Sequence, residues 1–135
     1  MNLERFVEAQ APVYHEALQE LRAGHKQSHW MWFVFPQIAG LGHSAMAQTY
    51  AIKSLEEARA YLTHPVLGAR LRECCQAVMD IEGKSAHHIF GSPDDLKFRS
   101  SLTLFDTASP NDVFRAALDK YFNGEADPLT SQKLR

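Results

Sequence analysis

The stretch PVLGARLRECCQAVMDIEG, residues 65–83, predicts one long amphipathic helix. Pro65 suits the first turn of a helix, and Gly83 suits the position just after its end. Between them, apolar side chains recur at helical spacing and fall near one face of the helix: Val66, Leu67, Leu71, Cys74, Cys75 and Val78. A helix of this length can form the centre of a hydrophobic core, and we expect it to be the core helix.

The composition of the chain is that of one globular domain. It has 135 residues, of which 45% are hydrophobic and 22% are charged, whereas disordered chains have fewer apolar and more charged residues. The formal net charge is −2 at pH 7, so no overall positive field exists to bind an extended nucleic acid. We expect a single domain over residues 1–135.

Membrane and secretion signals are both missing from the sequence. The longest uncharged stretch, residues 38–52, contains too many Gly, Ser, His, Gln and Thr residues to replace the roughly 20 apolar residues of a membrane span. The first ten residues, MNLERFVEAQ, carry acids where a signal peptide has an apolar block. We therefore expect a cytoplasmic protein that does not contact a membrane.

Capping residues and breakers predict several more helices, and hence a mainly α fold class. Helices are expected at residues 2–10, 12–24, 54–62, 85–91, 93–107 and 110–123, with a final turn from Asp127. The pairs Ser92-Pro93 and Ser109-Pro110 each predict a hydroxyl cap followed by proline in the first turn. Residues 29–42 break the helical pattern. The expected architecture is one compact multi-helix domain with an aromatic segment that is irregular or briefly extended.

That aromatic segment is HWMWFVFPQ, residues 29–37, with four aromatic side chains within six positions. If it is extended, alternate side chains face opposite sides, and both sides are apolar. One interpretation is that the whole segment fills the core. The other is that Trp30 or Trp32 stays partly open as a surface on which a base or ring stacks, with the Gln37 amide beside it as a two-way hydrogen-bonding group.

Glu57 and Asp94 are the candidate catalytic carboxylates. Hydrolysis of a glycosidic bond needs a carboxylate to position water or to stabilise an oxocarbenium-like transition state. The alternative is structural, since Glu57 forms a capping box with Ser54 and Asp94 lies where a helix begins. Lys97 is one turn after Asp94 and can pair with it or reach a phosphate. Ser100 and Ser101 follow as hydroxyl donors.

Basic and potential metal-binding side chains also occur in clusters. A basic cluster that runs up to the first residue of the aromatic segment either holds phosphate or forms a solvated face at a helix end: Arg22, His25, Lys26 and His29. His87 and His88 are adjacent and point in different directions on a helix, so they predict no metal site. Cys74 and Cys75 are also adjacent, which suits neither a disulfide nor a CxxC site. We expect buried thiols, no metal and no cofactor.

Five blocks occur in order along the chain: HWMWFVFPQ (29–37), GLGHS (40–44), EEARAYLTHPVLGARL (56–71), FGSPDDLKFRSSLTLF (90–105) and DKYFNGEADPLT (119–130). Together they resemble a small bacterial family of unknown function grouped with the YbiA-like, or NADAR, superfamily. The resemblance implies a YbiA-like helical fold. It also implies metal-independent N-glycosidase action on ADP-ribose attached to guanine or on related ribosylated heterocycles. It adds Phe33, Ser44 and Arg70 to the candidate binding residues.

Three functions follow as hypotheses. The first is an N-glycosidase acting on an ADP-ribosylated or related nucleotide-type substrate, in which Glu57 or Asp94 activates water. Its substrate-binding residues would be Trp30, Trp32, Phe33, Gln37, Ser44, Arg70, Lys97, Ser100 and Ser101. The second is a non-catalytic module for ADP-ribose or a similar nucleotide, and the third is a protein-interaction module that uses the aromatic segment. The mechanistic roles require both carboxylates and the tryptophans to converge in one pocket. The oligomeric state stays open.

Overall fold

A computed structural model describes residues 2–135, and within them it contains ten helices and one isolated parallel bridge between Ile38 and Ile52. The predicted mainly helical fold class is therefore confirmed. In chain order the helices are α1 (Glu4–Gln10), α2 (Tyr14–Arg22), α3 (Met31–Val34), α4 (Ala45–Thr49), α5 (Leu55–Thr63), α6 (Leu67–Met79), α7 (Ala86–Phe90), α8 (Asp94–Ala108), α9 (Val113–Phe122) and α10 (Pro128–Lys133). No helix among the described residues is long and apolar enough to cross a membrane.

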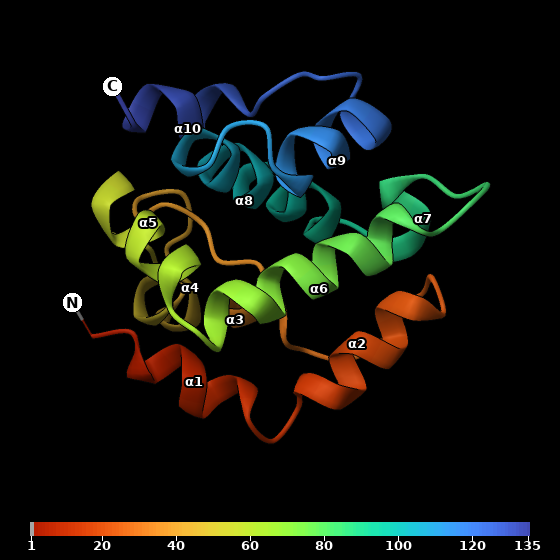
Figure 1. Ribbon diagram of the computed structural model, residues 1–135, viewed down its shortest axis with the longest axis horizontal. Coiled ribbons are helices and arrows are strands. Elements are labelled where there is room, and N and C mark those ends of the chain that lie inside the picture. The colour runs from red at the N-terminus through yellow and green to blue at the C-terminus, as the bar shows by residue number, and fades with distance from the viewer. Residues whose placement is uncertain (1) are drawn as a thin grey trace.

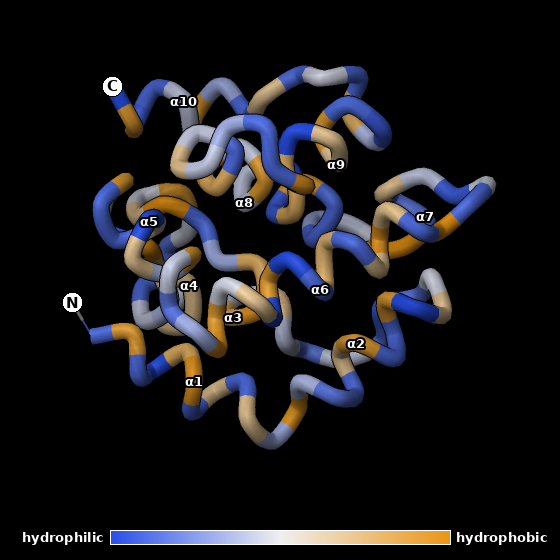
Figure 2. The backbone as a smooth tube through the Cα atoms, viewed as in Figure 1, coloured by the Kyte–Doolittle hydropathy of each residue, from blue (hydrophilic) through white to orange (hydrophobic). Residues whose placement is uncertain are grey.

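Helix α6 crosses the middle of the molecule, with α1 and α2 along one side and α8, α9 and α10 along the other (Figure 1). It packs against α2, α5 and α9. The predicted apolar face of α6 is buried from Leu67 to Val78, including both cysteines. Figure 2 shows the same mixture of apolar and polar residues along each of these helices, as amphipathic helices around one core require.

The turn from α5 into α6 depends on a glycine. A Cβ atom at Gly68 would lie 2.0 Å from the backbone oxygen of Leu62, closer than any two such atoms can approach. The start of α6 is capped by the preceding His64, whose Nδ1 accepts hydrogen bonds from the backbone N–H groups of Val66 (3.1 Å) and Leu67 (3.3 Å). Gly68 therefore lets the two helices meet at a sharp corner, and His64 satisfies the donors exposed there.

Within the aromatic segment, Met31–Val34 form a single helical turn, α3, so the segment is not the extended piece that was considered. Trp30 lies just before the turn and is 1% exposed, while Phe33 is buried within it and Trp32 is partly exposed. The indole Nε1 of Trp30 donates to a carboxylate oxygen of Glu20 at 3.0 Å. A stacking surface at either tryptophan was predicted; the structure leaves only Trp32 able to provide one.

Glu20 fixes the loop that precedes the aromatic segment. Its carboxylate also accepts hydrogen bonds from the backbone N–H groups of Gln27 (2.7 Å) and Ser28 (2.9 Å). Burial alone would raise the pKa of Glu20, but these hydrogen bonds, with those from the Ser28 hydroxyl and Trp30, lower the pKa below its ordinary value. The ionised form of Glu20 therefore stabilises this loop.

The two predicted Ser-Pro caps are wrong. Pro93, with no side-chain cap, occupies the N-cap position of α8, so Ser92 does not cap this helix. Helix α9 begins at Val113, later than predicted, because Asn111 has a φ of 65°, which no α-helix accommodates. The cap of α9 is Asp112, whose carboxylate accepts from the backbone N–H of Val113 at 2.7 Å.

Candidate functional site

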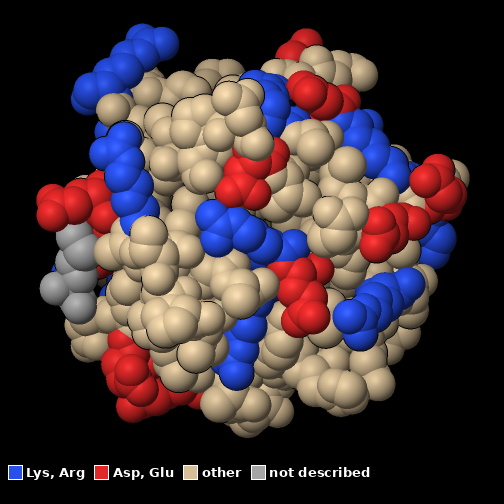
Figure 3. Space-filling model, viewed as in Figure 1, with Lys and Arg blue, Asp and Glu red and all other residues tan. Residues whose placement is uncertain are grey.

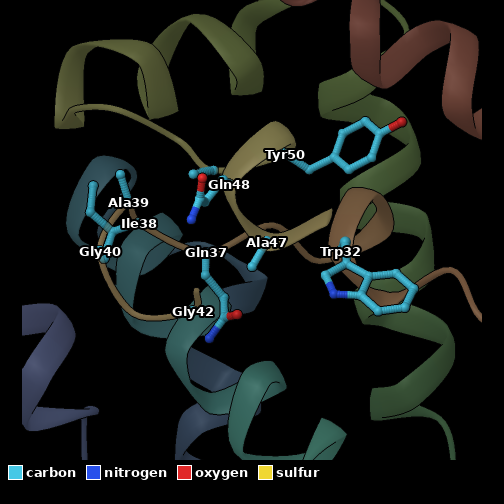
Figure 4. Close-up of a pocket in the computed structure, with 10 residues that line it drawn as sticks. Trp32, Gln37, Ile38, Ala39, Gly40, Gly42, Ala47, Gln48 and Tyr50 are labelled. Carbon is cyan, nitrogen blue, oxygen red and sulfur yellow. The ribbon is translucent and has the colours of Figure 1, made fainter. Parts of the chain in front are cut away.

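The site begins with a pocket of about 230 Å³ beside the aromatic turn. One wall is Trp32 from α3, a second is the loop of residues 37–42, and a third is the end of α4 with residues 47–51. In the view of Figure 4, Trp32 and Tyr50 lie on one side and Ile38, Ala39 and Gly40 on the other. We call this space the aromatic pocket, because two aromatic rings line it.

A second hollow of about 450 Å³ adjoins the aromatic pocket, since Gln37 and Gly42 line both. Its other walls are the first turns of α8, with Leu96, Lys97 and Ser100, and the start of α10, with Asp127 and Leu129. We call this space the α8 hollow and the two spaces together the groove. Four of the predicted binding residues line the groove: Trp32, Gln37, Lys97 and Ser100.

Small residues let the loop pass close to its neighbours. A Cβ atom at Gly42 would lie 2.7 Å from the Cβ atom of Ala47, so a side chain at position 42 would push the loop away from α4. Gly40 has a φ of 95°, which L side chains rarely adopt. The glycines that the sequence places in this loop are therefore required by its path along the groove.

The wall opposite the loop is held in place from behind by Arg5 of α1. Its guanidinium donates hydrogen bonds to the backbone oxygens of Thr49 (2.9 Å) and Ala51 (2.8 Å) and pairs with Glu57 at 3.3 Å. The isolated bridge adds a hydrogen bond from the backbone N–H of Ile52 to the backbone oxygen of Gln37 at 2.8 Å. The segment that carries Tyr50 is thus tied to both α1 and the loop.

Glu57 lies behind this wall and does not line the groove. It is 3% exposed. Besides Arg5, one carboxylate oxygen accepts from the backbone N–H of Lys53 at 3.0 Å, and its own N–H donates to the Ser54 hydroxyl at 3.1 Å. The Ser54 half of the predicted capping box is therefore present, while the Glu57 side chain bonds one residue earlier than the box requires. The ion pair with Arg5 and the hydrogen bond from Lys53 offset the cost of burying the Glu57 carboxylate.

Asp94 stands at the first turn of α8 between two lysines. Its carboxylate is 2.8 Å from the ammonium of Lys26 and 3.6 Å from that of Lys97. The Lys26 side chain is only 8% exposed, whereas that of Lys97 is 27% exposed. The Lys97 ammonium also lies 5.2 Å from the ring centroid of Trp32. Asp94 therefore neutralises Lys26 first, and Lys97 remains as a cation between Trp32 and the α8 hollow.

The other charged groups of the α8 hollow hold the start of α10. Asp127 caps α10, since its carboxylate accepts from the backbone N–H of Thr130 at 3.0 Å and from the Ser100 hydroxyl at 3.3 Å. Arg99 donates to the backbone oxygens of Glu125 and Ala126, both at 2.9 Å. Asp127 and Arg99 thus fix one wall of the hollow in position.

The remaining predicted site residues lie away from the groove. Phe33 is buried with its ring 5.3 Å from that of Tyr50, and Ser44 is the N-cap of α4. Arg70 lies 4.8 Å over the ring of Tyr14 on the α2 side. Ser101 is buried inside α8, and its hydroxyl has no hydrogen-bond partner. None of these four residues lines either part of the groove, so the structure does not bring all of the predicted binding residues together.

The predicted basic cluster does not gather around the groove either. Lys26 turns inward to Asp94, Arg22 pairs with Glu73 across the α2–α6 contact at 3.8 Å, and His25 and His29 are exposed. Over the face drawn in Figure 3, basic and acidic side chains are interspersed. In residues 2–135 no three His, Cys, Asp or Glu side chains are grouped so that they could hold a metal ion.

Tyr50 and Gln48 of the aromatic pocket were not predicted as site residues. Gln48 lies in α4 and Tyr50 directly follows it, in a stretch where no helix was expected. The sequence signal for α4 is Ser44, a residue type that favours the N-cap position of a helix. Its hydroxyl accepts a hydrogen bond from the backbone N–H of Ala47 at 3.1 Å and so caps the start of α4.

Comparisons with known proteins place the chain in a different group from the one its motifs suggested. The model of the family described as "Protein of unknown function (DUF1810)" matches residues 1–134. A solved structure, the conserved hypothetical protein Rv1873 from Mycobacterium tuberculosis, is 55% identical, with 98% of this chain and 96% of that chain covered and a TM-score of 0.97. No curated protein sequence matches the chain. The resemblance to the YbiA-like, or NADAR, superfamily is therefore wrong.

Proposed function

The chain belongs to the DUF1810 family of proteins of unknown function, and we propose that its groove binds a small anionic ligand with a flat ring, such as a nucleotide. The observation that carries the proposal is the meeting of Trp32 and Lys97 where the two parts of the groove join. An aromatic surface and an ammonium group at that distance suit a ring and an attached phosphate or carboxylate.

The charges near this junction favour an anion. Lys26, Asp94 and Lys97 form a chain of contacts with one net positive charge, and the most exposed of the three is Lys97. The aromatic pocket itself has no charged lining residue among those described. Asp127 is the acidic residue that lines the α8 hollow, and its oxygens already accept hydrogen bonds from Thr130 and Ser100. An anionic group beside Lys97 would therefore meet little repulsion.

Polar groups of the pocket support recognition of a ring edge. The side chain of Gln37 lines both parts of the groove and can donate and accept hydrogen bonds. Gln48 lies across the pocket and already donates to the backbone oxygen of His43 at 3.0 Å, which leaves its carbonyl oxygen as an acceptor. Stacking on Trp32 with hydrogen bonds to these amides is how a nucleotide base would be held.

Ligand binding without catalysis fits this geometry better than hydrolysis does. Asp94 has lysine partners on both sides, and Glu57 is buried behind the pocket wall. A carboxylate that activates water needs contact with that water beside the scissile bond, and neither group lines the groove. N-glycosidase action stays a prediction, which release of a free base from a nucleotide would support.

The test is calorimetric titration of the wild-type protein with ADP-ribose, NAD and GMP, followed by chromatography of the mixtures for released base. Loss of one charge-assisted hydrogen bond in Lys97→Met should weaken binding about tenfold or more. Lys53→Met removes a lysine that is exposed and outside the groove, and it should leave the affinity unchanged. Equal affinities in wild type and Lys97→Met, or no binding of any of the three, would overturn the proposal. Released base would instead favour the hydrolase.

A further inference from the structure

The most exposed large apolar side chains of the described residues lie on the groove. They are Leu129 and Leu96, which are 59% and 57% exposed, and both line the α8 hollow. Leu96 comes from the first turn of α8 and Leu129 from the first turn of α10, so two separate elements bring them to one place. Single exposed leucines are common on proteins, but two in the same hollow form an apolar wall that water solvates poorly.

The apolar wall is built on fixed supports. Leu129 follows Asp127 and Pro128, and the Asp127 carboxylate bonds the Thr130 N–H at 3.0 Å and the Ser100 hydroxyl at 3.3 Å. Leu41 from the loop completes the apolar lining on the third side. Because the first turn of α10 is tied to α8 in this way, the space between Leu96 and Leu129 is preformed.

The apolar wall also continues directly from the aromatic pocket. Gln37 and Gly42 line both spaces, and Lys97, which lies over the Trp32 ring, follows Leu96 in the chain. A ligand with its ring at Trp32 and its anionic group at Lys97 would have its next substituent beside Leu96. The hollow's charged residues Asp127 and Arg99 already hold the start of α10, so a charged substituent would compete with those contacts, whereas an apolar one would cover exposed leucine surface.

We propose that the ligand of the groove is amphipathic, with a second, apolar arm that lies between Leu96 and Leu129. The inference rests on the proposed function, since it takes the anionic group and the ring of the ligand to be at Lys97 and Trp32. It narrows the ligand class to anions in which a ring carries an aryl or alkyl extension. A plain nucleotide would fill the aromatic pocket and leave the two leucines uncovered.

Two sulfonates that differ only in such an arm test the proposal. Naphthalene-1-sulfonate has the ring and the anion, and 8-anilinonaphthalene-1-sulfonate adds a phenyl arm. Burial of that arm should make the second probe bind wild-type protein about tenfold more tightly in calorimetric titrations. The double variant Leu96→Ser/Leu129→Ser should abolish this difference and leave the affinity for naphthalene-1-sulfonate within about twofold.

Matched variants separate the possible outcomes. Met46→Ser removes an apolar side chain that is 38% exposed on α4 and does not line the groove, so both affinities should stay unchanged. Equal binding of the two probes by wild type, or an equal effect of Met46→Ser, would overturn the apolar arm while leaving the proposed function standing. Failure of both probes to bind would overturn both proposals. A dimer in sedimentation runs that the double variant dissociates would assign the leucines to a second copy of the chain and overturn the arm.

Discussion

Asp94→Asn is the substitution that most sharply tests the charge arrangement beside the groove. The Lys26 ammonium lies 2.8 Å from the Asp94 carboxylate, and their side chains are 8% and 20% exposed. Removing one partner of a buried ion pair costs about 3–5 kcal/mol, because the other charge is left without compensation. Asp94 is partly solvated and Lys26 keeps a hydrogen bond to the Ser28 backbone oxygen at 2.6 Å. We therefore expect a loss of about 2 kcal/mol.

That loss corresponds to a fall in melting temperature of about 7 °C for a chain of this length, measured by scanning calorimetry at pH 7. The control is Asp95→Asn, one residue further along the same helix. The Asp95 carboxylate lies 3.4 Å from Nδ1 of His87, whose side chain is 65% exposed. This substitution should lower the free energy of unfolding by less than about 1 kcal/mol. Lys97 loses its acidic neighbour in Asp94→Asn, so nucleotide affinity should stay the same or rise. Equal melting temperatures for the two variants would refute the role of Asp94 as the counter-ion of Lys26.

Three further predictions concern the fold. Gly68→Ala should destabilise the protein by more than about 3 kcal/mol in urea unfolding because its Cβ would meet a backbone oxygen at 2.0 Å; Gly83→Ala, with a φ of 74° and no neighbour within 4 Å, should cost about 1–2 kcal/mol. The lowered pKa of Glu20 means that its ionised form stabilises the fold above the ordinary value of 4.5 and that this stability is lost as the pH falls through the folded-state pKa. Glu20→Gln should therefore be less stable than wild type at pH 7, and the difference in unfolding free energy should narrow towards pH 3. A difference that does not change with pH would contradict a role for the ionised carboxylate. Burial raises the pKa of Cys74 to about 12 and that of Cys75 further, so a thiol reagent should label neither until guanidinium unfolds the chain; rapid labelling of the native protein would contradict this burial.

Local patterns in the sequence predicted most of the helices. The apolar spacing of residues 65–83 predicted the buried face of α6, and Ser54, Ser85 and Asp127 predicted the starts of α5, α7 and α10. These signals are local, since a cap or an apolar stripe acts within a few residues of its position. The start of α9 was missed because the left-handed conformation of Asn111 depends on its surroundings.

The site was harder to predict because it is assembled from distant segments. Trp32, Gln37 and Lys97 were identified as candidates from their chemistry, yet only the fold shows that they share a groove. Trp30 and Trp32 are two residues apart and equally apolar, and the helical turn of α3 alone decides that the first is buried and the second partly exposed. Glu57 looked like either a cap or a catalytic group, and its partner Arg5 lies 52 positions away. No spacing rule connects such pairs.

The most direct test of the central claim is tryptophan fluorescence titrated with ADP-ribose, NAD and GMP in single-tryptophan variants. Trp30→Phe keeps only the partly exposed Trp32, and Trp32→Phe keeps only the buried Trp30. A ring that stacks in the aromatic pocket should quench the fluorescence of Trp30→Phe in a saturable way and leave that of Trp32→Phe unchanged. Equal quenching of both variants, or none in either, would contradict the claim that the groove binds its ligand at Trp32.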